Sequence, residues 1–208
     1  VTSINFDSPN SYSGTGTISE TINDLSGNNV NASLVITPTT KVPVVKRTDT
    51  LYNGKEIIFT GELTTNPSLF WNTTSPINNF LKFLGMNNAS ISISFWVKLG
   101  IRKITDQEII VKWSDTAGFV GPWDIYQSHA LYAGSYINFR LWDGVSTSSY
   151  IARTGTKRVY TDKWMHICAT YNNTTKKMKT YIDSAIDIDS SVPSGYNLVN
   201  HPGNIYVG

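Results

Sequence analysis

The chain has 208 residues, of which 40% are hydrophobic and 15% are charged, and its formal net charge is +2. This length and apolar fraction suit one sizeable core, so we expect a single domain over residues 1–208. The lysines and arginines are scattered in short pairs, which argues against a nucleic-acid-binding surface. No apolar run reaches the roughly 18 residues of a membrane span, so no membrane insertion is expected.

The first 88 residues alternate short apolar runs with segments rich in serine, glycine and asparagine. Pro38 and Pro43 should keep the segment around them at a sheet edge or outside the sheet, because proline cannot donate to a strand ladder. Between residues 63 and 88 the pattern is irregular, and we expect a surface excursion with one short helix. The strands expected in this part are residues 3–6, 31–37 and 55–60.

The clearest alternation in the chain lies at residues 91–99. Every second side chain there is apolar, and the side chains between them are polar apart from one tryptophan, which predicts a strand with one face in the core. The core face is expected to carry Ile91, Ile93, Phe95, Val97 and Leu99, and the opposite face Ser92, Ser94, Trp96 and Lys98.

Further short strands separated by glycine-rich turns follow, and no repeat of 20 to 50 residues is found. Within residues 136–142, Ile137, Phe139 and Leu141 should oppose Tyr136, Asn138, Arg140 and Trp142. Residues 190–201 are expected to be a loop, and Asp187 and Asp189 to lie in a turn. The expected strands are residues 108–113, 123–127, 136–142, 149–153 and 204–207.

Residues 162–183 predict a β-hairpin, because two apolar-rich runs flank the short polar turn at residues 172–177. Both faces of the first arm carry bulky side chains, so this strand should lie centrally in a sheet or be covered on both sides. Many short strands without a long helix indicate an all-β sandwich.

The hairpin also resembles a known family. Its Trp164-x-His166 start and Tyr181-Ile182-Asp183 end are similar to the central hairpin of laminin-G-like domains in the concanavalin A-like lectin/glucanase superfamily. Residues 91–99 resemble the strand of that family that contains Phe-Trp-Val-Lys, and residues 57–61 resemble the strand before it. The resemblance implies a jelly-roll sandwich of two curved antiparallel sheets. Members usually add a strand after one like residues 205–208, so we expect that the last strand is missing or supplied by a neighbouring chain.

An enzyme is not expected. Retaining glycosidases need two carboxyl groups about 5 to 5.5 Å apart, and glucanases of the superfamily place them in a Glu-x-Asp-x-(x)-Glu pattern. None of the four glutamates, Glu20, Glu56, Glu62 and Glu108, lies in such a pattern. Asp106 and Glu108 come nearest, but their polar neighbours look like the entry to a strand.

Three segments pair a tryptophan with an aspartate near a turn, which suits carbohydrate recognition. Sugar sites combine an aromatic platform with groups that bind hydroxyls or hold a hard cation, and related lectins and pentraxins usually use calcium. The alternative is that the tryptophans are core residues and the aspartates form turns. The candidate sugar-binding residues are Trp113, Trp123, Tyr126 and Trp142, and the candidate ligands for calcium are Asp115, Asp124 and Asp143.

The sequence therefore predicts a non-catalytic carbohydrate-binding or adhesive module of a larger assembly. We expect an extracellular or virion-surface location, as in a virus or phage fibre, decoration or capsid-surface domain. The expected partners are a glycan or surface protein and neighbouring subunits of the assembly. A glycoside hydrolase of the same fold and a purely structural protein-interaction domain remain the alternatives.

Overall fold

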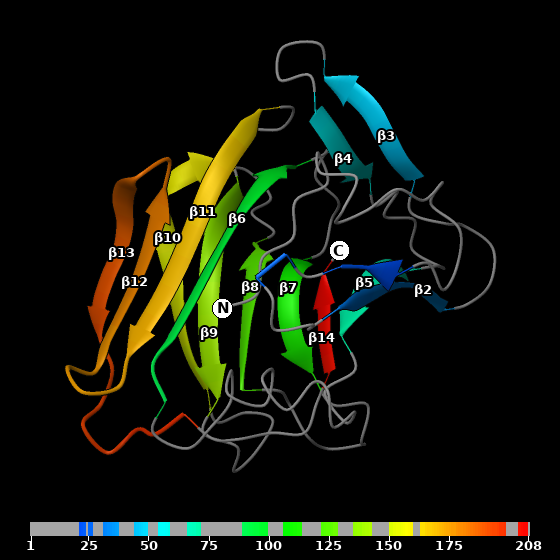
Figure 1. Ribbon diagram of the computed structural model, residues 1–208. Coiled ribbons are helices and arrows are strands. Elements are labelled where there is room, and N and C mark those ends of the chain that lie inside the picture. The colour runs from blue at the N-terminus through cyan, green and yellow to red at the C-terminus, as the bar shows by residue number, and fades with distance from the viewer. Residues whose placement is uncertain are drawn as a thin grey trace. The chain divides into compact units, whose positions relative to one another are not determined.

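A computed structural model describes thirteen segments of the chain, and every regular element in them is a β-strand (Figure 1). Within this part of the chain, no helix has the length and apolar character needed to cross a bilayer. The chain divides into two compact units, residues 1–81 with 204–208, and residues 82–203. The described segments are residues 21–23, 25–26, 31–37, 44–49, 54–58, 66–71, 89–99, 106–113, 122–128, 135–142, 150–159, 163–198 and 204–207.

The first unit contains an antiparallel sheet and a separate hairpin. The sheet has the order β1-β2-β5-β14, and the hairpin pairs β3 with β4. The expected strand at residues 3–6 lies outside the described residues. The elements are β1 (Thr21–Ile22), β2 (Ala32–Thr37), β3 (Val44–Asp49), β4 (Gly54–Ile58), β5 (Asn66–Trp71) and β14 (Asn204–Val207).

β5 corrects the expectation of a surface excursion between residues 63 and 88. Pro67 is the second residue of this strand and lies opposite Ile36 of β2. A proline near the first residue of a strand removes a single donor at its end, so the strand still forms. The rest of residues 63–88, where the short helix was expected, lies outside the described residues.

The second unit contains two antiparallel four-stranded arrays, which we call the front sheet and the back sheet. The front sheet has the order β13-β12-β11-β6, and the back sheet has the order β7-β8-β9-β10. Figure 1 shows the front sheet, coloured green to orange, lying before β9 and β10. The strands are β6 (Ile91–Lys98), β7 (Gln107–Trp113), β8 (Trp123–Gln127), β9 (Ser135–Trp142), β10 (Tyr150–Val159), β11 (Trp164–Asn172), β12 (Lys177–Ile182) and β13 (Ala185–Ser191).

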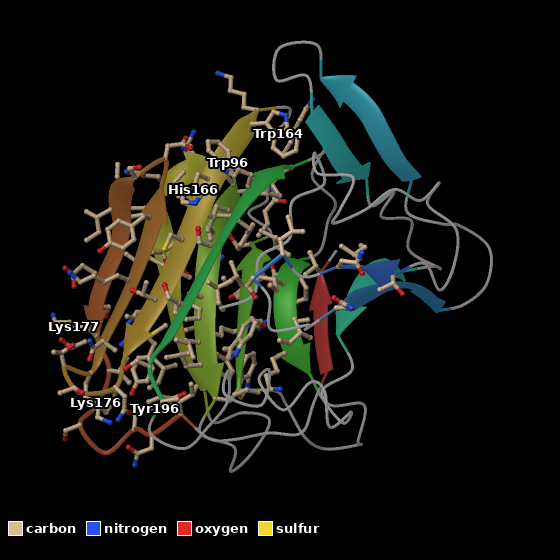
Figure 2. All side chains as sticks on the ribbon, viewed as in Figure 1. Trp96, Trp164, His166, Lys176, Lys177 and Tyr196 are labelled. Atoms are coloured by element: carbon tan, nitrogen blue, oxygen red, sulfur yellow. The ribbon has the colours of Figure 1, made fainter. Side chains whose placement is uncertain are left out.

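The predicted hairpin is confirmed as β11 and β12, and β11 lies between β12 and β6 in the interior of the front sheet. Its turn ends at Lys176, which has a φ of 51°. The Lys176 ammonium donates hydrogen bonds to Asn173 Oδ1 at 2.9 Å, to the Tyr196 carbonyl at 2.6 Å and to Asn197 Oδ1 at 3.1 Å. These bonds tie the segment after β13 to the hairpin tip, where Figure 2 shows Lys176 and Tyr196.

β13 corrects the expectation of a turn around Asp187 and Asp189, since both residues lie within this strand. Asp189 pairs with Lys179 of β12 at 3.2 Å. Asp187 is buried, and its Oδ1 accepts hydrogen bonds from the backbone N–H groups of Thr156 at 2.8 Å and Lys157 at 2.7 Å. These two N–H groups lie where the register between β9 and β10 shifts, so they bond to the Asp187 carboxylate in place of a backbone carbonyl of β9. Asp187 thereby links β13 of the front sheet to β10 of the back sheet.

Apolar side chains from both sheets of the second unit form the core. The alternation predicted for residues 91–99 is confirmed, with the isoleucines buried and the serines exposed. Each fully buried aliphatic or aromatic side chain contributes about 1.5–3 kcal/mol to stability, so this layer fixes which face of each strand turns inward. The inward side chains include Ile91, Ile93, Ile125, Ile137, Phe139, Leu141, Met165, Ile167, Ala169, Tyr171 and Met178.

Candidate functional site

The candidate site lies on the face of the back sheet that points away from this core. Trp123 and Ile125 of β8 pair with Leu141 and Phe139 of β9 on the core face. Successive side chains of a strand alternate between faces, so the residues between them turn the other way. That outer face carries two cross-strand pairs, Asp124 with Arg140 and Tyr126 with Asn138.

Arg140 is the centre of the site. Its Nε donates to both carboxylate oxygens of Asp124 at 2.9 Å, and its terminal nitrogen also bonds to Asp124 Oδ2. The same terminal nitrogen donates to Glu108 Oε1 of β7 at 2.8 Å. The Asp124 side chain is fully buried, and a planar guanidinium that binds both oxygens is the partner best suited to a buried carboxylate.

Aromatic rings surround the guanidinium. The Arg140 Cζ atom lies 4.1 Å from the ring centroid of Tyr126 and 4.9 Å from that of Trp142. The Trp142 ring lies 5.7 Å from the ring of Tyr150 on β10, tilted by 51°. Both distances from Arg140 are within cation–π range, so rings and guanidinium hold one another in place. We call Glu108, Asp124, Tyr126, Arg140, Trp142 and Tyr150 the Arg140 cluster.

Burial and neighbouring charges change the protonation of this cluster. Burial, reinforced by the negative charge of Asp124 and opposed by Arg140, raises the pKa of Glu108 to about 8. Burial also raises the pKa of Tyr126 to about 12. Glu108 therefore keeps its proton at neutral pH, and the single negative charge of Asp124 balances the positive charge of Arg140.

Three side chains of the cluster reach solvent. Tyr150 is 49% exposed, and the side chains of Glu108 and Arg140 are 41% and 20% exposed. Tyr126 and Trp142 are buried behind them, and the Trp142 carbonyl accepts a hydrogen bond from the Tyr196 hydroxyl at 2.9 Å. The groups of the cluster that reach solvent are thus one aromatic ring on β10, a carboxyl group on β7 and part of a guanidinium group on β9.

A family model described as "Concanavalin A-like lectin/glucanases superfamily", of the laminin G type, matches residues 72–208. The chain belongs to this superfamily. The match covers more than half of the sequence and confirms both the resemblance seen in the central hairpin and the all-β jelly-roll fold. A search of curated protein sequences finds no match.

Solved structures of this fold resemble the chain at low sequence identity. A type C botulinum neurotoxin structure has a TM-score of 0.55 at 19% identity and covers 89% of this chain and 39% of its own. Domain 4 of AbnA, an extracellular GH43 arabinanase from Geobacillus stearothermophilus, has a TM-score of 0.56 at 13% identity, with coverage of 89% and 76%. The binding domain of botulinum neurotoxin serotype D has a TM-score of 0.55 at 18% identity, with coverage of 92% and 42%. The chain thus spans about two fifths of the toxin chains.

The lectin-like fold brings three of the predicted site residues together, since Asp124, Tyr126 and Trp142 all contact Arg140. It separates Trp123 from them, because this fully buried side chain lies on the core face of β8. The Trp113 side chain, Asp115 and Asp143 lie outside the described residues.

Of the three candidate calcium ligands, the structure describes only Asp124. Arg140 binds both oxygens of Asp124, whereas a calcium ligand needs a carboxylate oxygen directed at the cation. In the described part of the chain, no three histidine, cysteine or acidic side chains gather closely enough to hold a metal ion. Calcium binding stays a prediction that depends on Asp115 and Asp143.

Three members of the cluster, Glu108, Arg140 and Tyr150, were not predicted as site residues from the sequence. The alternation of residues 136–142 does place Arg140 on the face of Trp142, which is the one signal that pointed to it. Nothing in the sequence shows that β7, β8, β9 and β10 are neighbours in that order. The cluster depends on this order, because its side chains come from all four strands.

Glu108 and Asp124 form a carboxyl pair across two neighbouring strands, and both bind Arg140. In glycosidases one carboxyl donates a proton and the other must reach the sugar or a water molecule. The raised pKa of Glu108 suits an acid, but Asp124 is fully buried and both of its oxygens bind Arg140. These contacts therefore favour a structural role for Asp124 over a catalytic role in hydrolysis.

Proposed function

We propose that this chain is a non-catalytic carbohydrate-binding module that serves a larger extracellular or surface assembly. The observation that carries the proposal is the exposed ring of Tyr150, which packs against Trp142 at the β10 end of the Arg140 cluster, while the Glu108 and Arg140 side chains of the same cluster also reach solvent. An aromatic ring can stack on the apolar face of a sugar while neighbouring polar groups bind its hydroxyls. With Glu108 protonated, the cluster has no net charge, which suits a neutral sugar.

The similar structures support this proposal. Cell entry of the type C neurotoxin depends on interaction with two ganglioside molecules, and the AbnA domain was solved with arabinotriose. A further botulinum neurotoxin binding domain, with a TM-score of 0.53 at 17% identity, was solved with rat synaptotagmin II. Carbohydrate is thus the first partner to test, and a surface protein is the second.

The nature of the assembly stays a prediction. Toxins and an extracellular arabinanase are both consistent with a module that acts outside the cell. They do not support the expected virus or phage particle, which stays an expectation from the sequence alone.

The proposal is tested with the full chain on an array of neutral and acidic glycans, followed by titration of the best ligand. Tyr150→Ala should weaken binding roughly tenfold, because it removes the accessible ring. Ile186→Ala is the matched control, since Ile186 is also a large exposed side chain but lies on β13 of the front sheet. Equal affinity of Tyr150→Ala and the wild type would place the sugar site elsewhere. No binding to any glycan would contradict the function itself.

Repeating the titration with calcium and with EDTA tests the expected cofactor. If EDTA abolishes binding and calcium restores it, Asp115 and Asp143 become the ligands to change. If EDTA has no effect, the sugar is held by side chains alone.

The alternative of a glycoside hydrolase is tested by incubating the same oligosaccharides with the wild type and with Glu108→Gln. A binding module leaves the sugars intact in both cases. Release of new reducing ends by the wild type and not by Glu108→Gln would show that Glu108 acts as a catalytic acid, and would refute the non-catalytic assignment.

A further inference from the structure

The face of the front sheet that points away from the core carries a band of apolar and aromatic side chains across its four strands. Trp96 of β6 is 65% exposed and Ile186 of β13 is 46% exposed, and these two large side chains mark the ends of the band. Tyr181 of β12 lies opposite Ile186, and Cys168 of β11 lies opposite Tyr181, so the middle of the band is continuous. We call the following residues the front band: Trp96, Trp164, His166, Cys168, Tyr181 and Ile186.

The β6 end of the front band has a defined geometry. The ring centroids of Trp96 and His166 lie 5.3 Å apart, and the ring planes are tilted by 50°. His166 Nε2 and the Ser94 hydroxyl lie 2.7 Å apart in a hydrogen bond, and the His166 backbone N–H donates to Asp183 Oδ1 at 2.8 Å. Figure 2 shows Trp96, Trp164 and His166 gathered at this end of the two strands. Side chains that are already held in place lose little conformational entropy when a partner covers them.

A polar border lies beside the front band, toward the β11–β12 turn. Two lysines of β12 there, Lys177 and Lys179, lie 3.7 and 3.2 Å from Asp189 of β13, so they have an acidic partner within the chain. Several large apolar side chains with a polar border are typical of a protein interface, because together they exclude water. A sugar would need flat rings or hydroxyl-binding groups along the band, which Cys168 and Ile186 do not offer.

The face is large enough for a weak protein partner. Its four strands have six to nine residues each. With strands about 4.8 Å apart and a rise of about 3.3 Å per residue, the face covers about 500 Å². Two such faces together bury about 1,000 Å², which is near the lower limit for a specific interface. A partner sheet of the same size would therefore bind weakly and reversibly.

The front band is complementary to itself. A two-fold axis that runs parallel to the strands, between β11 and β12, places β6 over the partner's β13 and β11 over the partner's β12. The two sheets then stack face to face with aligned strands, which is a common packing of sheets. In this arrangement Tyr181 faces the partner's Cys168, and Ile186 comes over the partner's Ser94, next to the partner's Trp96. The exposed ends of the two bands thus cover each other.

The same axis brings opposite charges together. Asp183 is exposed and lies beside His166, because its backbone N–H donates to the His166 carbonyl at 2.9 Å and its carboxylate accepts the His166 N–H. In the dimer Asp183 comes over the partner's His166, one strand away from the partner's Lys98, whose exposed side chain is long enough to reach it. In the polar border Lys179 comes over the partner's Thr170, so it meets no like charge.

We propose that the front band joins two copies of this chain in a weak two-fold dimer. Trp96 and Ile186 are the anchors of the interface, and the pair of Lys98 with the partner's Asp183 fixes the relative orientation. A two-fold interface uses the same surface on both copies, so it closes and gives a dimer instead of a filament. The front band shares no residue with the Arg140 cluster, so the dimer can be measured without knowing the sugar.

The first test measures the mass of the full chain by sedimentation velocity, from low micromolar to near-millimolar concentration. The wild type should shift from monomer to dimer as its concentration rises. Trp96→Ala and Ile186→Ala should each weaken association at least tenfold, because each removes an anchor. Tyr150→Ala is the matched control, since it removes an exposed ring from the back sheet, and it should associate as the wild type does. A wild type that stays monomeric throughout would overturn the interface, as would equally strong association of Trp96→Ala.

A charge exchange tests the two-fold arrangement itself. Lys98→Glu and Asp183→Lys should each associate much more weakly than the wild type, because either homodimer brings two pairs of like charges together. An equimolar mixture should recover the dimer, since both contacts of the mixed pair then join opposite charges. Two folded variants that do not associate when mixed would overturn this arrangement.

Thermal unfolding of every variant serves as the control for folding, since Asp183 also caps the His166 N–H. If Asp183→Lys does not fold, Lys98→Glu and Trp96→Ala still decide the matter, because association as strong as in the wild type would overturn the interface. Absence of self-association together with binding of a sugar that Trp96→Ala abolishes would overturn the dimer in favour of a sugar surface.

Discussion

Arg140 and Asp124 lie opposite each other on β9 and β8 and form a buried ion pair in which the guanidinium binds both carboxylate oxygens. The pair lies on the outer face of the back sheet. The side chains of the Arg140 cluster that reach solvent depend on this pair for their position. Removing one partner of such a pair leaves the other charge buried without compensation, which is far more costly than removing both.

Arg140→Met should therefore lower the free energy of unfolding by about 3–5 kcal/mol, because it leaves the Asp124 carboxylate buried alone. Arg140→Lys should recover only part of this loss, since an ammonium cannot bind both oxygens in the same plane. The double variant Asp124→Leu with Arg140→Met should be much closer to the wild type. Urea unfolding of the three variants measures these differences, and additive losses in the double variant would show that the two residues are not coupled.

Glu108 should make stability fall as the pH rises from about 5 to 8. Its pKa is raised from 4.5 to about 8 in the folded chain, so over this range the folded state keeps a proton that the unfolded state has lost. The stabilisation is complete below pH 4.5 and is lost as the pH passes 8. Since 41% of the side chain is exposed, solvent limits the effect to about 1 kcal/mol, or about 2–4 °C in the unfolding temperature.

Glu108→Gln is the variant that isolates this effect, because it keeps the shape of the side chain without the titrating proton. The difference in unfolding temperature between variant and wild type should change between pH 5 and pH 8. A constant difference across this range would mean that Glu108 ionises in the folded chain as it does in the unfolded one.

Lys112 of β7 should produce the opposite dependence at higher pH. Burial lowers its pKa from 10.5 to about 8, and its side chain is fully buried. Between these values the unfolded state binds more protons, so stability should rise with pH by about 3 kcal/mol. Lys112→Met should remove this rise, which denaturant unfolding at pH 7.5 and pH 10 would detect. An equal rise in wild type and variant would assign it to other groups.

The sequence predicted most of the strands of the second unit because their alternation is set by the core. The bounds of β8 agree with the prediction, as do those of β14 in the first unit, and the two faces of β6 are those expected from residues 91–99. When one face of a strand is buried, every second residue must be apolar, and this alternation can be recognised in the sequence of the strand itself. The strand at β5 was not predicted because the apolar pattern between residues 63 and 88 is irregular, and Pro67 is tolerated there because it lies near the strand end.

The candidate site could be predicted only in part, because it depends on contacts between strands. Aromatic residues next to aspartates led to Asp124, Tyr126 and Trp142, but the same reasoning included Trp123, which the alternation of β8 turns into the core. Arg140 binds the carboxyl groups of both Asp124 and Glu108, and its role appears only once β8 and β9 are paired. Which strands pair is a property of the whole fold, and it cannot be predicted from the sequence pattern of a single strand.

Gly155 of β10 is needed because of its contact with Asp187. A Cβ atom at this position would overlap the Asp187 carboxylate and lie 2.8 Å from the Ile137 carbonyl oxygen. Gly155→Ala should lower stability by about 3 kcal/mol, because Asp187 must move away from the Thr156 and Lys157 N–H groups that it caps. Gly195→Ala is the matched control, since nothing lies within 4 Å of its Cβ position, and it should change stability by less than about 0.5 kcal/mol. Urea unfolding compares the two variants, and equal stabilities would mean that the β10–β13 connection adapts to the added methyl group.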